Sequence, residues 1–246
     1  MKIVTIIRQV PDAEARVRVD NGQVALSGAA WVLDGMDEYG VEQALRLRDE
    51  GHEVEILALA LGPAGTEDAL RTALAMGADR AHLLETDLSL DVLATAQSLA
   101  SVIQCEQADL VFVGGKQADW DSAALGAALA ELLGWTFSDW TTSFTVNGQD
   151  LTVRHDSDAG SETLHLSLPA VISTQQGLND PRYPTLPNIM KAKRKELTRE
   201  PMTSQDSKTE VVGRDLEQRE REGRILQGDA TQAAQELASM LKEVGR

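Results

Sequence analysis

Apolar runs alternate with helically spaced apolar positions along the first 135 residues of this 246-residue chain. Near-continuous apolar runs, typical of parallel strands buried on both faces of a sheet, lie at residues 3–7, 54–59, 81–84 and 109–113. Between them, the helical spacing predicts helices at residues 37–50, 66–77, 89–107 and 121–133. Because strands and helices alternate, we expect right-handed crossovers and a doubly wound parallel α/β sheet.

Two Asn-Gly pairs predict β-hairpins, which would add antiparallel strands to this sheet. Asn21-Gly22 lies between residues 16–19 and 23–26. Asn147-Gly148 separates residues 144–146 from 151–153, and a further alternating strand is predicted at 163–166.

The chain turns polar after Lys195, and no further strand of the core pattern is expected there. The pattern predicts an α/β domain over residues 1–195 and a C-terminal arm over residues 196–246. The arm ends in a predicted helix at 231–244, whose apolar residues lie on one stripe. That stripe must cover either this chain's own sheet or a partner.

Composition excludes several classes of function. A formal net charge of -16 argues against binding nucleic acid, because phosphates would be repelled by most of this surface. No run approaches the roughly 20 apolar residues of a membrane span, and no signal-peptide pattern opens the chain, so we expect a cytoplasmic protein without direct membrane insertion. The single cysteine, Cys105, is expected to be a buried packing thiol.

Residues 178–195 carry the most unusual pattern in the chain. Pro181, Pro184 and Pro187 each fix φ and remove a backbone donor, so we expect a shaped loop with no regular helix before Asn188. The loop offers Tyr183 and Leu186 as apolar anchors, and the basic residues Lys191, Lys193, Arg194 and Lys195 follow. An apolar side chain beside local positive charge favours docking to an acidic partner protein.

The two commonest phosphate-binding fingerprints, G-x-G-x-x-G and G-x-x-x-x-G-K-[ST], are absent. Ligands of parallel sheets nevertheless bind outside the carboxyl ends of the strands, where Gly62 and Gly114-Gly115 lie. Spacing alone favours the alternative that these glycines only form turns and that Ser122 only caps a helix. The four histidines have no metal-ligand spacing, so we expect no metal site, and no catalytic set of residues has motif support.

The loop at 178–195 resembles the recognition loop of the β subunit of electron-transfer flavoproteins. Further matches to that family occur in the family's order at Gly62-Pro63-Ala64, at residues 71–80, at Gly115-Lys116-Gln117-Ala118 and at Leu168-Pro169-Ala170-Val171. The resemblance covers nearly the whole chain. It implies an adenine-nucleotide-binding α/β fold of the electron-transfer flavoprotein type.

The resemblance also implies cofactors. In that family the matching β-subunit segments surround an AMP molecule, bound largely through backbone groups, while the redox FAD is held mainly by the α subunit. The implied cofactor-contacting positions in this chain are Ile6, Asp34, Gly35, Met36, Asp37, Leu61, Gly115, Lys116, Gln117, Ala118, Asp119, Trp120, Asp121, Ser122, Ala123, Ala124 and Leu125.

Three departures from the family pattern bear on these cofactors. Asp34-Gly35-Met36 replaces the Asn-Pro-Phe of many members, Ala123-Ala124-Leu125 replaces polar residues, and Ala13 replaces a flavin-contacting tyrosine of some relatives. Alanine and leucine side chains cannot donate to a phosphate, so backbone amides would have to serve. AMP, a second FAD or no ligand at all are each compatible with the crevice.

The resemblance implies an electron carrier rather than an enzyme. A heterodimer with the α subunit would take electrons from acyl-CoA or other flavin dehydrogenases, as in fatty acid oxidation, and pass them to a quinone oxidoreductase. Leu186 matches the family's anchor leucine, and the implied partner-binding set is Tyr183, Leu186, Pro187, Ile189, Met190, Lys191 and Arg194. Two alternatives stay open: a bifurcating-type β subunit with a second FAD, and a homodimeric nucleotide-binding regulatory module.

Overall fold

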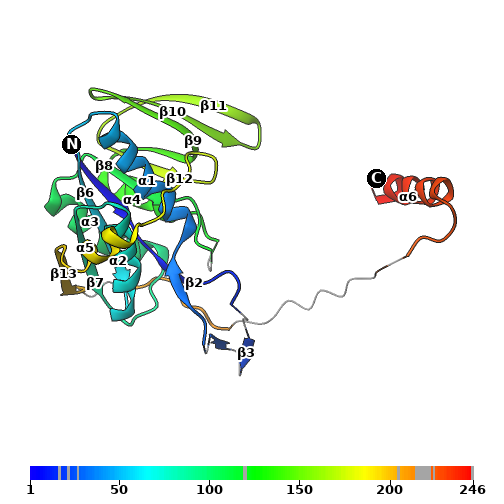
Figure 1. The fold of residues 1–246 in the computed structure, drawn as a ribbon, viewed down its shortest axis with the longest axis horizontal. Coiled ribbons are helices and arrows are strands. Elements are labelled where there is room, and N and C mark those ends of the chain that lie inside the picture. Colours follow the sequence, from blue (N-terminus) through cyan, green and yellow to red (C-terminus); the bar gives the residue numbers. More distant parts are fainter. Residues whose placement is uncertain are drawn as a thin grey trace.

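The computed structural model describes residues 1–15, 18–20, 23–26, 28–118, 121–203, 206–213, 223 and 225–244. Its centre is a nine-stranded sheet in the order β11-β10-β9-β12-β8-β1-β6-β7-β13 (Figure 1). Seven neighbouring strands run parallel, in the order β9, β12, β8, β1, β6, β7 and β13. The strands β10 and β11 continue the sheet beyond β9 in antiparallel pairs. The bounds are β1 Lys2–Ile6, β6 Glu55–Gly62, β7 Arg80–Glu85, β8 Leu110–Gly114, β9 Thr136–Asn147, β10 Asp150–Ser157, β11 Gly160–Ser167, β12 Ala170–Thr174 and β13 Leu197–Pro201.

Helices cover both faces of the sheet, as the doubly wound prediction requires. The helices α1 (Gly35–Asp49) and α2 (Glu67–Met76) contribute to one hydrophobic core. On the opposite face, α3 (Val92–Glu106) and α4 (Leu125–Leu133) contribute to a second core. The short helix α5 (Leu186–Ala192) contacts α2 from outside, and a 3-10 turn at Ala64–Thr66 leads into α2.

Strand β1 shows why the apolar runs are continuous. Ile3 packs into the core under α1 and α2, whereas Val4 and Ile6 pack into the core under α3 and α4. Successive strand residues point to opposite faces, so a strand with helices on both sides must be apolar at nearly every position. The run at residues 3–7 therefore encodes the central position of β1.

The predicted hairpins are present. β3 (Arg18–Asp20) pairs with β4 (Gln23–Ala25) in antiparallel register, and the predicted turn residues Asn21 and Gly22 lie outside the described residues. β2 (Gln9–Pro11) and β5 (Trp31–Leu33) form a second small sheet beside them. β9, β10 and β11 form the later antiparallel extension, with Gly148 at a φ of 64° in its turn.

Most element boundaries differ from the prediction by a few residues, and two of the differences affect the loops near the predicted sites. Helix α4 begins at Leu125 rather than at residue 121, because Ala123 takes a left-handed φ of 52° that interrupts helical continuation. Helix α5 begins at Leu186, so the expectation that no helix precedes Asn188 is wrong. Pro187 fits the first turn of α5 because backbone N–H groups there have no partner within the helix. Ser122, in turn, does not cap α4.

One strand follows Lys195, although it does not have the core pattern. β13 (Leu197–Pro201) extends the sheet in parallel pairing with β7. As an edge strand it takes its hydrogen bonds from the β7 backbone, and its side chains are mostly exposed, which explains why it lacks a core pattern. An ion pair from Arg199 to Glu67 on α2 fixes it further.

Cys105 is exposed, which corrects the expectation of a buried thiol. It lies two residues beyond Ile103, which is fully buried, and two residues in a helix turn the side chain by about 200°.

The C-terminal helix α6 (Ala230–Val244) is present as predicted, and it lies apart from the sheet (Figure 1). Among the described residues, no helix has both the length and the apolar character needed to cross a membrane.

Candidate functional site

The candidate site lies where the direction of strand order changes. From β1 the chain crosses to β6 on one side, whereas β8 is the neighbour on the other side. Chain segments therefore diverge at the carboxyl ends of β1 and β8, which leaves a crevice of the kind that binds ligands in doubly wound sheets. Arg8 follows β1, and Gly114 ends β8 at this point.

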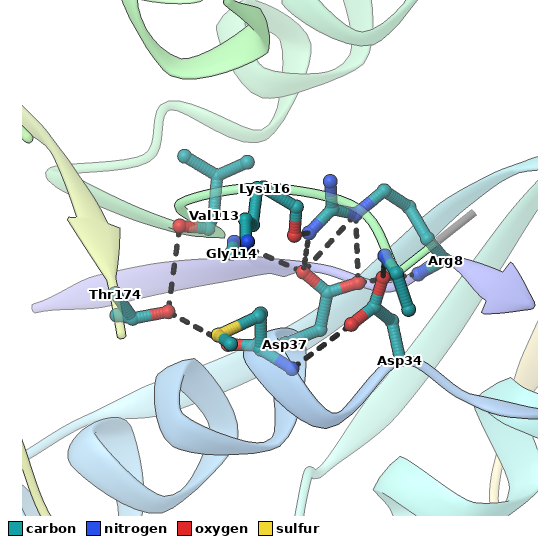
Figure 2. A network of polar contacts seen from close by, with 9 residues as sticks. Arg8, Asp34, Asp37, Val113, Gly114, Lys116 and Thr174 are labelled. Atoms are coloured by element: carbon teal, nitrogen blue, oxygen red, sulfur yellow. Dashed lines mark hydrogen bonds and ion pairs between the residues drawn. The ribbon is translucent and has the colours of Figure 1, made fainter. Parts of the chain in front are cut away.

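A buried ion pair between Arg8 and Asp37 joins the two strand ends to the start of α1 (Figure 2). The Arg8 backbone N–H, Nε and Nη2 donate to the Asp37 carboxylate at 2.8, 2.9 and 2.7 Å. Gly114 N–H donates to the Asp37 Oδ1 at 2.9 Å, and Arg8 Nη2 reaches the Lys116 carbonyl at 3.2 Å. The Asp37 carboxylate thus fixes the end of β1, the start of α1 and the end of β8 relative to one another.

Asp34 makes a second set of hydrogen bonds in the same network. Its Oδ1 accepts from Met36 N–H and caps α1, and its Oδ2 accepts from Ala118 N–H at 2.9 Å. Its own N–H donates to the Arg8 carbonyl at 2.9 Å. The loop after β8 is therefore held on both sides, because Asp37 binds Gly114 at the end of β8 and Asp34 binds Ala118.

Carboxylates crowd the start of α1, and this sets where an anionic ligand would bind. Burial raises the pKa of Asp37, although Arg8 opposes the shift. Burial also raises the pKa of Glu38, with Asp34 and Asp37 adding to the effect. Because Asp34 already caps α1 and acidic residues fill its first turn, the N-terminus of α1 is a poor site for a phosphate.

The start of α4 contrasts with that of α1. Ala124 precedes the helix and no side chain caps it. Among the residues that the structure describes, none accepts from its first backbone N–H groups, an arrangement that favours anions at helix N-termini. Lys116 contributes positive charge nearby, with its Nζ 3.4 Å from the Asp121 carboxylate.

The crevice contains a pocket with a volume of 950 Å³. This volume is at the upper end of the range typical of small-molecule sites. Of the positions predicted to contact a cofactor, Ile6, Leu61, Gln117 and Leu125 line it. Arg8 and Gly62 add to the same wall. The opposite wall comes from the start of α3 and from the tail, through residues 88–92, Thr95, Leu99 and residues 207–211.

The other predicted positions have different surroundings. Asp34, Met36, Asp37, Gly115, Lys116 and Ala118 form or border the polar network, Gly35 opens α1, and residues 121–124 form the exposed segment before α4. Asp119 and Trp120 lie outside the described residues.

The glycines at the strand ends are explained by packing. A Cβ on Gly62 would meet Thr66 Oγ1 at 2.6 Å, and one on Gly114 would overlap Arg8 and Asp37. Both glycines are thus required by the fold itself, so their presence is no sign of a ligand.

Sequence reasoning missed Arg8 and the tail residues at 207–211. An arginine directly after a buried strand, with an acidic helix start at residues 34–38, is a signal that could have revealed the ion pair. The tail carried no such signal, because its residues are polar and exposed.

The predicted docking loop is firmly anchored at its base. Arg182 donates to the buried Glu42 carboxylate at 2.8 and 3.0 Å and to Asp49 at 2.7 Å, both on α1. Asn179 Nδ2 donates to the Tyr39 carbonyl, and Leu178 is buried.

The far end of the loop is attached to α2. Arg71 Nη1 donates to the carbonyls of Ala192 and Lys195, at 2.9 and 3.0 Å. Lys195 Nζ donates to the Leu74 and Ala78 carbonyls near the end of α2, and burial lowers the pKa of Lys195. Lys195 therefore belongs to the fold rather than to the basic surface.

Between these anchors the loop presents apolar side chains to solvent. Tyr183 is 93% exposed and Leu186 is 79% exposed. Ile189 and Met190 on α5 are also exposed, as are Lys191 and Arg194. The predicted partner-binding residues are thus grouped on one projecting segment whose two ends are held by hydrogen bonds.

The fold and the crevice define a doubly wound α/β protein with a ligand-sized pocket at its switch point and a projecting apolar loop. Residues 21–204 match the electron transfer flavoprotein domain. The chain is 39% identical over 199 residues to an electron transfer flavoprotein subunit beta from Bradyrhizobium diazoefficiens, covering 80% of each chain.

Longer alignments give the same result. The chain is 33% identical to the corresponding subunit of Syntrophomonas wolfei over 242 residues, which are 98% of this chain and 96% of the relative. It is 34% identical to that of Mus musculus over 258 residues, covering 100% of this chain and 98% of the relative. The chain belongs to the electron transfer flavoprotein family, and these relatives are its β subunits.

Proposed function

We propose that this chain is the β subunit of a heterodimeric electron transfer flavoprotein that carries electrons from flavin dehydrogenases to a quinone oxidoreductase. The observation that carries the proposal is the loop at residues 178–195, with its fixed base and exposed apolar tip. In this role the chain does not turn over a substrate of its own.

The loop geometry suits transient docking. Leu186 supplies an apolar anchor that is solvent-exposed in the free chain, so burying it in a partner's pocket gains hydrophobic free energy. Because Arg182 and Arg71 hold the loop ends, little conformational entropy is lost when the anchor binds. Lys191 and Arg194 lie beside the anchor and would speed encounter with an acidic dehydrogenase surface.

We assign the binding of the α subunit to the C-terminal arm, residues 196–246. Leu237 and Leu241 lie one turn apart on α6, and both are exposed. An amphipathic helix gains most of its stability from burying its apolar face. The exposed apolar stripe of α6 therefore indicates that a partner surface covers it. The α subunit would cover it and hold most of the FAD, whose flavin supplies the one- and two-electron chemistry.

We assign an adenine nucleotide, AMP in the simplest case, to the crevice. The pocket volume, the uncapped start of α4 and the cationic residue Lys208 on the pocket wall support this assignment. The contacts to phosphate would be backbone amides near Leu125, since Ala123 and Ala124 have no side-chain donors.

Co-expression with an electron transfer flavoprotein α subunit from the same genome tests the proposal. We expect a yellow heterodimer with one FAD, which is reduced when an acyl-CoA dehydrogenase and its acyl-CoA substrate are added. Heating the complex should release AMP beside FAD; two FAD per heterodimer would point to bifurcation. A chain that purifies as a homodimer and never binds the α subunit would overturn the assignment.

A further inference from the structure

The tail crosses the mouth of the crevice before it leaves the domain. After β13, Met202 N–H still donates to the Glu85 carbonyl at the sheet edge. Residues 206–211, which we call the strap, then lie against the start of α3. Within the C-terminal arm, the strap thus lies between β13 and α6.

Asp91 fastens the strap. Its Oδ1 accepts from Ala94 N–H at 2.8 Å and caps α3, while its Oδ2 accepts from the N–H groups of Lys208 and Thr209 at 2.5 and 3.0 Å. Asp91 N–H donates in return to Ser207 Oγ at 3.0 Å. These N–H donors hold the pKa of Asp91 below its ordinary range. The attachment is therefore specific, with separate oxygens for the helix and for the strap.

The strap is part of the pocket wall. Residues 207–211 line the same cavity as Ile6, Leu61, Gln117 and Leu125. A ligand that fills this space must contact the strand ends on one side and the strap on the other. Ligand binding and strap attachment are then linked, because each adds contacts that stabilise the other.

Lys208 is the cation on this wall that is available to a ligand. Arg8, the other basic lining residue, is held on Asp37 and on the Lys116 carbonyl. Lys208 is exposed and forms no ion pair with the described residues. The acidic neighbours are Glu210, which also lines the pocket, and Asp91, whose oxygens are already occupied by N–H donors.

We propose that the strap forms a wall of the nucleotide site and that Lys208 contacts the phosphate of the bound nucleoside monophosphate. This inference rests on the nucleotide site of the proposed function. Positive charge from Lys208 would offset the lack of side-chain donors at residues 123–125. The part of the arm that precedes the partner-binding helix α6 would thereby contact the nucleotide directly.

Isothermal titration of the nucleotide-free heterodimer with AMP and with adenosine tests the proposal. In Lys208→Met, AMP affinity should fall about 10- to 100-fold, the effect of losing one hydrogen bond between charged groups, and adenosine affinity should change less than about 2-fold. The matched control Arg154→Met removes an exposed cation of β10 that does not line the pocket, and it should leave both affinities unchanged. In Asp91→Asn the cap on Ala94 persists but the strap is released, so both ligands should weaken about 3- to 10-fold.

The outcomes separate this inference from the proposed function. If Lys208→Met binds AMP as the unmodified complex does, or loses adenosine equally, the phosphate contact is refuted while the nucleotide site stands. Unchanged binding in Asp91→Asn refutes the strap as a wall. If the unmodified complex binds neither AMP nor adenosine, the nucleotide site and the strap inference fail together.

Discussion

The Arg8 guanidinium and the Asp37 carboxylate lie 2.7 Å apart, and the Asp37 side chain is fully buried. The two residues are 29 positions apart in the chain, and their pairing brings together β1, the start of α1 and the end of β8. A buried ion pair therefore positions the loops that shape the crevice, whereas apolar packing holds most of the surrounding fold.

Asp37→Asn should destabilise the protein strongly. The substitution leaves the Arg8 guanidinium buried without its counter-ion, and breaking such a pair costs about 3–5 kcal/mol. We expect a lower urea midpoint of the purified heterodimer, measured at fixed protein concentration. Asp121→Asn is the matched control, because its exposed contact with Lys116 should contribute no more than about 1 kcal/mol. Equal midpoints for the two variants would show that the buried pair does not hold the site together.

Gly114→Ala should disrupt the same network sterically. An added Cβ would overlap Arg8 Nη2 and Asp37 Oδ1 and approach Met36 Cβ to 2.9 Å. We expect a loss of about 1–3 kcal/mol in unfolding free energy. Gly35→Ala is the control because nothing lies within 4 Å of its added methyl group. A neutral Gly114→Ala variant would mean that the network can relax around the methyl group.

Leu186→Ala should slow electron transfer from the dehydrogenase without changing the FAD content of the heterodimer. The side chain is 79% exposed, so its removal costs little stability, while a docking anchor typically contributes about 1–3 kcal/mol to binding. We expect a rise of about 5- to 100-fold in the KM for the heterodimer in an acyl-CoA dehydrogenase assay. Leu132→Ala, at a partly exposed leucine of α4, should behave like the unmodified complex. An unchanged KM for Leu186→Ala would remove the anchor role.

Glu106 gives a pH-dependent prediction. Its hydrogen bonds from Arg80 hold the pKa of Glu106 below its ordinary value of 4.5. Because the pKa is lowered in the folded state, this contribution is fully present above pH 4.5 and is lost as the pH falls through the lowered pKa. Glu106→Gln should therefore cost about 1 kcal/mol near neutral pH, and the difference should shrink at lower pH. A difference that stays constant across urea titrations at several pH values would contradict this account.

The docking loop shows what a local sequence pattern can predict and what it cannot. The prolines of residues 178–195 predicted a shaped projection, and the structure leaves Tyr183 and Leu186 in solvent. What the prolines could not reveal is that Arg182 meets Glu42 across 140 residues of sequence, which is the contact that fixes the loop base.

The sequence by itself determined the buried parallel strands, the helices between them and their layering, because apolar periodicity follows directly from which faces must leave water. It also determined the hairpins, since Asn-Gly pairs favour the turns that they need. The tertiary structure alone decided that β13 joins the sheet edge, that Arg8 meets Asp37 and that the strap lies on Asp91. These contacts use backbone groups and single polar side chains from distant segments, and such groups leave no periodic pattern along the chain.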